Sequence, residues 1–436
     1  MAPMAPVKPS PSPHQNRASM VVIGVLFFIF GFVTWLNGPL ITFVKLAFTL
    51  DDVNAFLIPM VFYLSYLFLS LPSSWVLRRT GMKKGMGAGL FVMAVGAALF
   101  GECATIRVYP GALAGLFVIG AGLSLLQTAA NPYISILGPI DSAAQRIAVM
   151  GICNKVAGML APVAIGALVL SGIDTLDQQV KAAPTPEARE ALLSAFAAKI
   201  HLPYLAMAAL LALLAVWVVR SPLPEISADS NAGGESRDGD TPPLSRIPHL
   251  WLGVLCLFLY VGVEVMAGDA IGTYGHGFDL PLDETKFFTS FTLAAMLAGY
   301  LGGLVLIPRV LSQERYLALS AALGVVLTIA AYATHGYASV ACVAALGFAN
   351  AMMWPAIFPL GIRGLGRHTE IGSAFMVMGI AGGAVLPQLF VQLKQHFPFQ
   401  AVFLALMAPA YLYILFFALY GHRVGRKAAI AAPSLA

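Results

Sequence analysis

Apolar residues fill most of the chain in long runs, which short polar segments separate. A helix that spans a membrane needs about 20 predominantly apolar residues. Twelve runs reach that length, and they predict an all-α protein that crosses the membrane twelve times. The expected spans are 19–48, 54–77, 85–106, 111–138, 146–171, 201–220, 248–274, 285–308, 315–334, 337–362, 369–393 and 399–421.

Three polar segments divide these spans into larger units. The first residues are rich in proline, and the segment after the sixth span is rich in Gly, Ser and Pro with charges of both signs. Such compositions are typical of solvated tails and linkers. We therefore expect a disordered tail (1–18), a six-helix bundle (19–220), a linker (221–247), a second six-helix bundle (248–421) and a final tail (422–436).

The two halves show a weak internal repeat. Pro132 and Pro162 in the first half correspond to Pro355 and Pro387 in the second, and each pair flanks a polar loop. Two six-helix halves of the same orientation imply a pseudo-two-fold axis along the membrane normal, with a binding site near the midplane between them.

Composition excludes several other classes. The chain is 59% hydrophobic and only 10% charged, whereas soluble domains carry about 25% charged residues. This composition disfavours a soluble enzyme and excludes a disordered chain. The four cysteines lie singly in apolar stretches, so we expect neither a disulfide scaffold nor a metal cluster.

Charge placement predicts the orientation in the membrane. Most of the 25 Lys and Arg residues fall in segments on the same side as both termini. The positive-inside bias therefore places both termini in the cytoplasm, and three of the remaining basic residues lie in one long outer loop. The net charge of +5 reflects this topology and does not indicate a nucleic-acid partner.

Several charged residues lie within the expected spans, and the most informative are Lys155, Glu264 and Asp269. A charge near mid-membrane costs about 2.5 to 3.5 kcal/mol on translocon scales, so it faces protein or water and not lipid. We expect Lys155 to pair with Glu264 or Asp269, and these three residues to couple an ion to the movement of the halves. The alternatives are a structural Glu264 and an Asp269 that only marks a helix end.

Side-chain amides recur in the first, fourth, fifth and tenth spans. Amides offer donors and acceptors that suit the hydroxyl groups of a sugar, and an aromatic face suits its C–H surface. The alternative is that these amides only join helices to each other. The expected substrate contacts are Asn37, Gln127, Asn131, Asn154, Asn350 and Trp354.

Several segments resemble a known family. They are FFIFGFVTWLNGPL, LQTAANPYISILGP, LYVGVEV and ANAMMWPAIFPLGIRGLGRHTEIGSAFMVMGIAGG. The chain resembles the major facilitator superfamily, and within it the fucose–galactose–glucose:proton symporter family, most nearly its glucose/galactose branch. The resemblance implies two pseudo-symmetric six-helix bundles that import a monosaccharide with a cation by alternating access.

The chain also departs from that family. Gly38 and Gln127 stand where fucose-transporting members carry acids, and Gly151 stands where a sugar-binding Gln is expected. Asn154 matches the Asn of the family's fifth helix. The proton route of those members therefore does not carry over, and both H⁺ and Na⁺ remain open. Sodium, if it is the coupling ion, is expected near Glu264.

The sequence thus predicts a bacterial inner-membrane symporter for a sugar of the glucose/galactose or N-acetylglucosamine type. Its expected partners are the sugar, the cation and membrane lipid. We expect a monomer without cofactor, resident metal or enzymatic activity. The alternatives are an exporter of drugs or metabolites on the same fold and, in another class, a membrane channel or enzyme.

Overall fold

The structure is a computed structural model that describes residues 13–136, 143–224, 243–307, 310–365 and 368–425. The described part of the chain is helical and contains no strand. Its first half comprises α1 (Pro13–Thr34), α2 (Asn37–Ala47), α3 (Asp52–Ala55), α4 (Leu57–Thr80), α5 (Met82–Thr105), α6 (Tyr109–Ile136), α7 (Ala143–Leu168), α8 (Ile173–Lys181), α9 (Pro186–Ala198) and α10 (His201–Arg220). Its second half comprises α11 (Pro248–Gly268), α12 (Ile271–His276), α13 (Leu282–Thr285), α14 (Phe288–Leu306), α15 (Gln313–Ala333), α16 (Gly336–Asn350), α17 (Met353–Ile362), α18 (Thr369–Met378), α19 (Gly382–Leu393) and α20 (Phe399–Leu419).

The number of membrane spans agrees with the hydropathy pattern. Among the described residues, eleven helical segments are long and apolar enough to cross a membrane. Helices α16 and α17, which meet at a bend of 40°, form a twelfth span if they are taken together. Each of the twelve predicted runs overlaps one of these spans, so the twelve-helix all-α prediction is confirmed.

Some helical segments lie outside the expected spans. Helix α1 begins at Pro13, within the tail that we expected to be disordered, and residues 1–12 lie outside the described residues. The long outer loop after α7 contains two helices, α8 and α9. Thr185 caps α9 by accepting a hydrogen bond from the backbone of Ala188, and Pro186 occupies the first turn, where a missing N–H is tolerated.

The predicted linker and final tail are described only in part. Residues 225–242 and 426–436 lie outside the described residues. Near the end of the predicted linker, just before α11, Leu244–Arg246 form the short 3₁₀ helix η3.

Several of the described spans are interrupted along their length. Breaks separate α1 from α2, α11 from α12, and α16 from α17, while the 3₁₀ helix η5 (Gly379–Ala381) separates α18 from α19. Proline explains two breaks, because its ring clashes with the carbonyl group four residues earlier. Pro39 disrupts the helix at Trp35, and Pro355 disrupts it at Ala351. Irregular backbone at membrane depth is tolerated only inside protein or beside a cavity, so the breaks point to the middle of the bundle.

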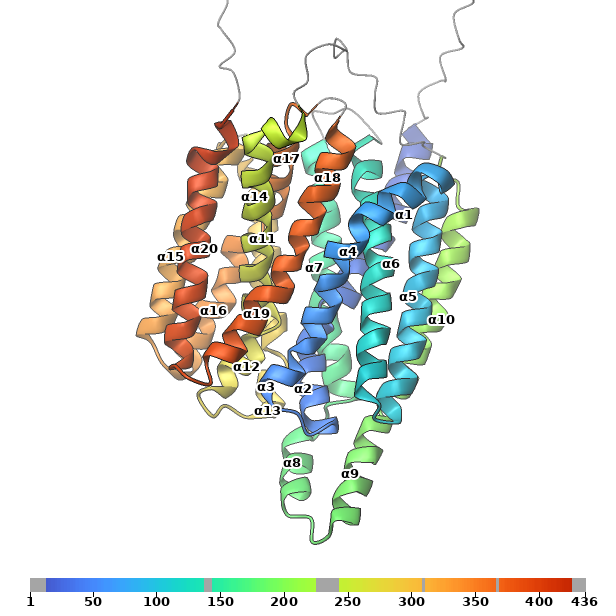
Figure 1. The fold of residues 1–436 in the computed structure, drawn as a ribbon, viewed down its shortest axis with the longest axis vertical. Helices are drawn as coiled ribbons and strands as arrows, with labels where there is room; N and C mark the ends of the chain where they lie inside the picture. The colour runs from blue at the N-terminus through green and yellow to red at the C-terminus, as the bar shows by residue number, and fades with distance from the viewer. Residues whose placement is uncertain (1–12, 137–142, 225–242, 308–309, 366–367, 426–436) are drawn as a thin grey trace, which may run out of the picture.

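The two halves lie side by side (Figure 1). Within each half, a glycine brings two helices into backbone contact. A Cβ atom on Gly31 of α1 would lie 1.8 Å from the carbonyl oxygen of Asn154 in α7, and one on Gly382 of α19 would lie 1.7 Å from that of Phe258 in α11. Only glycine fits at such contacts, as is common between membrane helices. The close approach fixes the position of Asn154 and, through α11, of Glu264.

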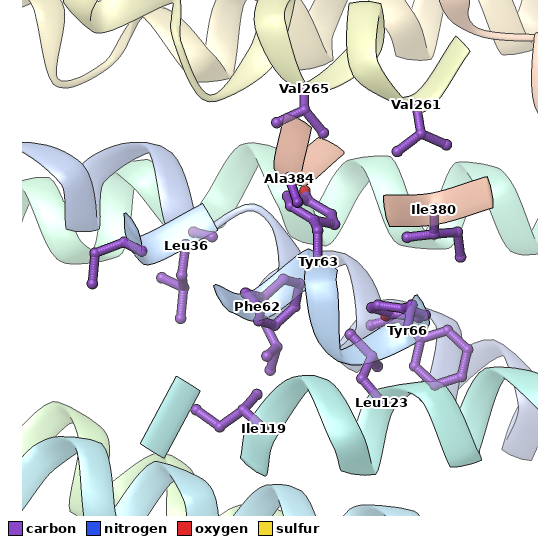
Figure 2. Close-up of a cluster of buried hydrophobic side chains, with 14 of the residues drawn as sticks. Leu36, Phe62, Tyr63, Tyr66, Ile119, Leu123, Val261, Val265, Ile380 and Ala384 are labelled. Carbon is purple, nitrogen blue, oxygen red and sulfur yellow. The ribbon is translucent and has the colours of Figure 1, made fainter. Parts of the chain in front are cut away.

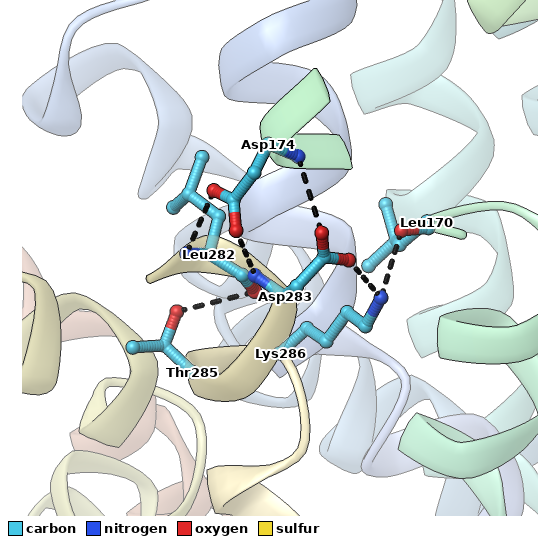
Figure 3. Close-up of polar contacts among 6 residues, drawn as sticks. All are labelled: Leu170, Asp174, Leu282, Asp283, Thr285 and Lys286. Carbon is cyan, nitrogen blue, oxygen red and sulfur yellow. Dashed lines mark hydrogen bonds and ion pairs between the residues drawn. The ribbon is translucent and has the colours of Figure 1, made fainter. Parts of the chain in front are cut away.

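The halves are joined at the end of the molecule where α8 and α9 lie, which we name the distal end. It is opposite to the end where α1 begins and α20 finishes (Figure 1). The carboxylate of Asp174 accepts hydrogen bonds from the backbone N–H groups of Leu282 and Asp283, at 3.0 Å each. Lys286 donates to the carbonyl oxygen of Leu170 at 2.9 Å (Figure 3). These contacts hold the halves together at the distal end.

Helix α4 lies at the interface between the halves. Figure 2 shows Phe62 on the side of α6 and Tyr63 reaching toward Val265 and Ala384 in the second half. All four side chains are buried. Tyr63 is therefore anchored by apolar packing while its hydroxyl group lies in the interface.

Candidate functional site

A cavity of about 130 Å³ lies between the two halves. It is lined from the first half by α1, α4, α6 and α7, and from the second by α11, α14, α17 and η5. The broken spans thus meet at the cavity, as expected for a binding site near the midplane. The lining residues are Phe27, Phe30, Thr34, Trp35, Tyr63, Tyr66, Gln127, Asn131, Ile147, Gly151, Asn154, Lys155, Tyr260, Val261, Glu264, Val265, Tyr300, Trp354, Pro355 and Ile380.

An ion pair crosses this cavity from one half to the other. Nζ of Lys155 on α7 lies 2.9 Å from Oε1 of Glu264 on α11, and the two side chains are only 8% and 12% exposed. Nζ of Lys155 also lies 4.5 Å from the ring centroid of Trp35, which adds a cation–π contact. Of the two partners that the sequence predicts for Lys155, Glu264 and Asp269, the structure shows the pair with Glu264.

Amide and aromatic groups surround the ion pair. Gln127, Asn131 and Asn154 line the cavity, and Gln127 donates a hydrogen bond from Nε2 to the Tyr66 hydroxyl at 3.0 Å. Trp354 lines the opposite side and stacks on Phe358 with ring centroids 5.7 Å apart. The cavity therefore offers hydrogen-bond donors, acceptors and aromatic faces to a small hydroxylated solute.

Three of the predicted site residues do not line the cavity. Asn350 ends α16 inside the second half, where Oδ1 accepts a hydrogen bond from the Tyr411 hydroxyl at 2.8 Å. Asn37 begins α2 and is 1% exposed. Asp269 follows α11 and accepts a hydrogen bond at Oδ2 from the Tyr63 hydroxyl at 3.4 Å. The last two belong to a separate buried polar cluster beside the cavity.

Two tyrosines that the sequence pattern did not indicate, Tyr66 and Tyr300, also line the cavity. Each lies in an apolar run, where a tyrosine hydroxyl group is a weak signal for a polar cavity. Tyr300 also explains the absence of a side chain at position 151, because a Cβ atom on Gly151 would lie 2.6 Å from Cε1 of the Tyr300 ring. The second half therefore fills space that a longer residue on α7 would occupy.

The described residues contain no group of three or more His, Cys, Asp or Glu side chains that could hold a metal ion. Glu264 is instead engaged by Lys155. The chemistry available in the cavity is that of hydrogen bonding, aromatic stacking and one ion pair.

Comparison with known sequences and structures places this geometry in context. The sequence model of the Major Facilitator Superfamily matches residues 23–387. The crystal structure of the transporter FucP in the outward conformation has a TM-score of 0.73 and 27% sequence identity, and the match covers 93% of this chain and 99% of that chain.

Two curated relatives extend over most of the sequence. The glucose/galactose transporter of Brucella abortus (strain 2308) is 31% identical over 425 residues, which cover 96% of this chain and 98% of that protein. The L-fucose-proton symporter of Escherichia coli (strain K12) is 30% identical over 380 residues, covering 85% and 86%.

Proposed function

The chain belongs to the major facilitator superfamily, and from that premise we propose that it imports a monosaccharide together with a cation by alternating access. It is a multi-pass membrane protein with the fold of sugar transporters. Its relatives carry the names glucose/galactose transporter and L-fucose-proton symporter. A sugar is accordingly the proposed substrate class, of the glucose/galactose or N-acetylglucosamine type, and transport rather than an enzymatic reaction is the proposed activity.

The chemistry of the cavity supports a sugar. Gln127, Asn131 and Asn154 present amides from the first half, while Trp354 presents an aromatic face from the second. A ligand that contacts both halves stabilises the state in which they close around it. The volume of about 130 Å³ is small beside the roughly 300 to 1,000 Å³ of pockets for drug-sized ligands, which favours a small solute over the cargo of a drug exporter.

The observation that carries the proposal is the Lys155–Glu264 ion pair within that cavity. Its two members come from different halves, so the pair lengthens or breaks when the halves rock apart. Sugar hydroxyl groups can hydrogen-bond to both charges and compete for this pair. In this way the pair links occupancy of the cavity to the equilibrium between conformations.

The proposal includes an orientation. The positive-inside bias of the loops supports cytoplasmic termini in a bacterial inner membrane, with the distal end facing outward. The contacts of Asp174 and Lys286 then close the outer side. We propose that a single chain suffices for transport, because both of its halves line the cavity.

The deciding experiment is uptake by the purified chain in proteoliposomes. Labelled glucose, galactose, N-acetylglucosamine and L-fucose are supplied in turn, with pH and sodium gradients imposed separately. We expect one of these sugars to accumulate above its outside concentration under one of the gradients. Saturable exchange of labelled for unlabelled sugar would exclude a channel. Failure of every sugar to exchange would contradict the proposal.

A further inference from the structure

Asp269 is a buried carboxyl group at the junction of the two halves. It is 2% exposed, and among the described residues its Oδ1 atom has no hydrogen-bond partner. The first half contributes Tyr63, whose hydroxyl group donates to Oδ2, and the backbone amide of Gly38. Nearby, Nδ2 of Asn37 is also buried without a partner among the described residues. The polar cluster around Asp269 is therefore incompletely satisfied.

The glycine at position 38 leaves room for this carboxyl group. A Cβ atom on Gly38 would lie 3.4 Å from Oδ1 of Asp269 and 2.6 Å from Oγ1 of Thr289. The Thr289 hydroxyl group already donates to the carbonyl oxygen of Gly268. Asp269 thus occupies, from the second half, the space beside α2 that a side chain of the first half would otherwise fill.

The charges in this part of the interface do not balance. The charged and titratable groups that face Asp269 are Lys155, Glu264 and Tyr63. Lys155 forms an ion pair with Glu264, with Nζ 2.9 Å from Oε1. Among the described residues, no cationic side chain forms an ion pair with Asp269. A buried charge without a partner is strongly disfavoured in a membrane protein and becomes neutral instead.

We propose that Asp269 is the proton-binding carboxyl group of this transporter. The inference rests on the proposed function and specifies its cation. Asp269 binds the proton when the halves part at the distal end and water reaches its carboxylate. The protonated, neutral acid can then be buried as the halves close. Lys155 and Glu264 form an ion pair at 2.9 Å, so one proton on Asp269 brings the three charged groups to neutrality.

The surroundings of Asp269 favour a proton over a metal ion. A hard cation such as sodium or calcium is held by several oxygen ligands, but the groups from the first half that face the carboxyl group are hydrogen-bond donors, namely the Gly38 amide and the Tyr63 hydroxyl. Tyr63 also lines the sugar cavity. It therefore connects the proton site with the substrate site.

The test compares Asp269→Asn with the wild type in proteoliposomes. Asparagine mimics the neutral acid, so the variant should still change conformation and exchange sugar. It should not use a proton gradient, because it neither binds nor releases a proton. At an inward gradient of one pH unit, the wild type can reach about tenfold accumulation if one proton accompanies each sugar. The variant should show none, while its counterflow exchange stays close to wild type.

Two further variants separate this role from a structural one. Asp279→Asn makes the same change at an exposed position of the distal end, and should accumulate sugar like the wild type. Asp269→Glu restores a titratable group and should recover part of the accumulation. Proton uptake on addition of sugar, recorded in weakly buffered medium, should be seen for the wild type and not for Asp269→Asn.

Each other result would overturn the inference. Accumulation by Asp269→Asn under a pH gradient would show that the proton binds elsewhere. Loss of exchange together with accumulation would indicate a structural residue. If the wild type exchanges sugar but accumulates it only under a sodium gradient, sugar:cation symport still holds, and Asp269 is not a proton-binding site. A wild type that exchanges no sugar would remove both proposals together.

Discussion

Asp174 on α8 and Asp283 on α13 cap each other's helices across the boundary between the two halves. Asp174 accepts hydrogen bonds from the first backbone N–H groups of α13, and Asp283 accepts one from the backbone N–H of Asp174 at 3.4 Å. Free N–H groups at a helix N-terminus attract a carboxylate. Because each carboxylate serves the opposite half, the exchange stabilises the closed distal end and is lost when that end opens (Figure 3).

Asp174→Ala should therefore shift the protein toward the state with an open distal end. Removing the acceptor leaves two N–H groups of α13 without their carboxylate. A loss of about 1 kcal/mol changes the ratio of the two states roughly fivefold. Electron paramagnetic resonance between spin labels at Ser171 and His276, one on each half, should show longer distances in Asp174→Ala than in the wild type. Asp174→Asn retains one acceptor oxygen and should give an intermediate shift. Equal distance distributions in all three proteins would contradict the prediction.

Replacing one member of the Lys155–Glu264 ion pair should destabilise the protein more than replacing both members. Removing one member of a buried pair strands the other charge and typically costs about 3 to 5 kcal/mol, whereas replacing both with apolar residues is often neutral. We expect Lys155→Met and Glu264→Met each to lower the unfolding temperature in detergent. The double variant should recover most of that loss but should not accumulate sugar. Additive losses in the double variant would mean that the two residues do not interact.

Amides inside and outside the cavity should behave differently on substitution. Gln127→Ala and Asn154→Ala each remove a polar contact available to the sugar, so KM for uptake should rise about two- to tenfold. Asn350→Ala leaves the buried Tyr411 hydroxyl without its acceptor. It should cost roughly 1 to 3 kcal/mol of stability and leave KM unchanged. A rise in KM for Asn350→Ala at unchanged stability would show that this amide reaches the substrate.

The sequence predicted the spans well, because hydropathy depends only on local composition. It also predicted a partner for Lys155, since few acids lie within the spans. Which amide reaches the cavity depends on how each helix is rotated and where it breaks, and these are properties of tertiary packing. Asn154 faces the cavity, whereas Asn350, on another apolar helix, turns toward Tyr411. Pro39 is visible in the sequence, but its effect on the first span appears only when α2 is seen to restart at Asn37.

The sequence shows two unusual glycines, but it does not show which side chains pack against them. Gly38 lies against Asp269, and Gly151 lies against Tyr300. In both cases the second half supplies the side chain that fills the space beside the first half. Such compensation joins residues more than 140 positions apart in the chain, so no local pattern could indicate it.

Substitutions at either Gly151 or Tyr300, which are in contact, should change the size of substrate that the cavity accepts. Tyr300 is 4% exposed and lines the cavity, so Tyr300→Ala should enlarge the space available to the sugar. Uptake of N-acetylglucosamine relative to glucose should then rise, by roughly tenfold if the ring excludes one small substituent. Tyr300→Phe keeps the ring and is the matched control, with an unchanged ratio. Gly151→Ala places a Cβ atom 2.6 Å from the ring, which must then move into the cavity, so the ratio should fall. If Tyr300→Ala and Tyr300→Phe give the same ratio, the ring does not bound the substrate site, because only the alanine variant removes its volume.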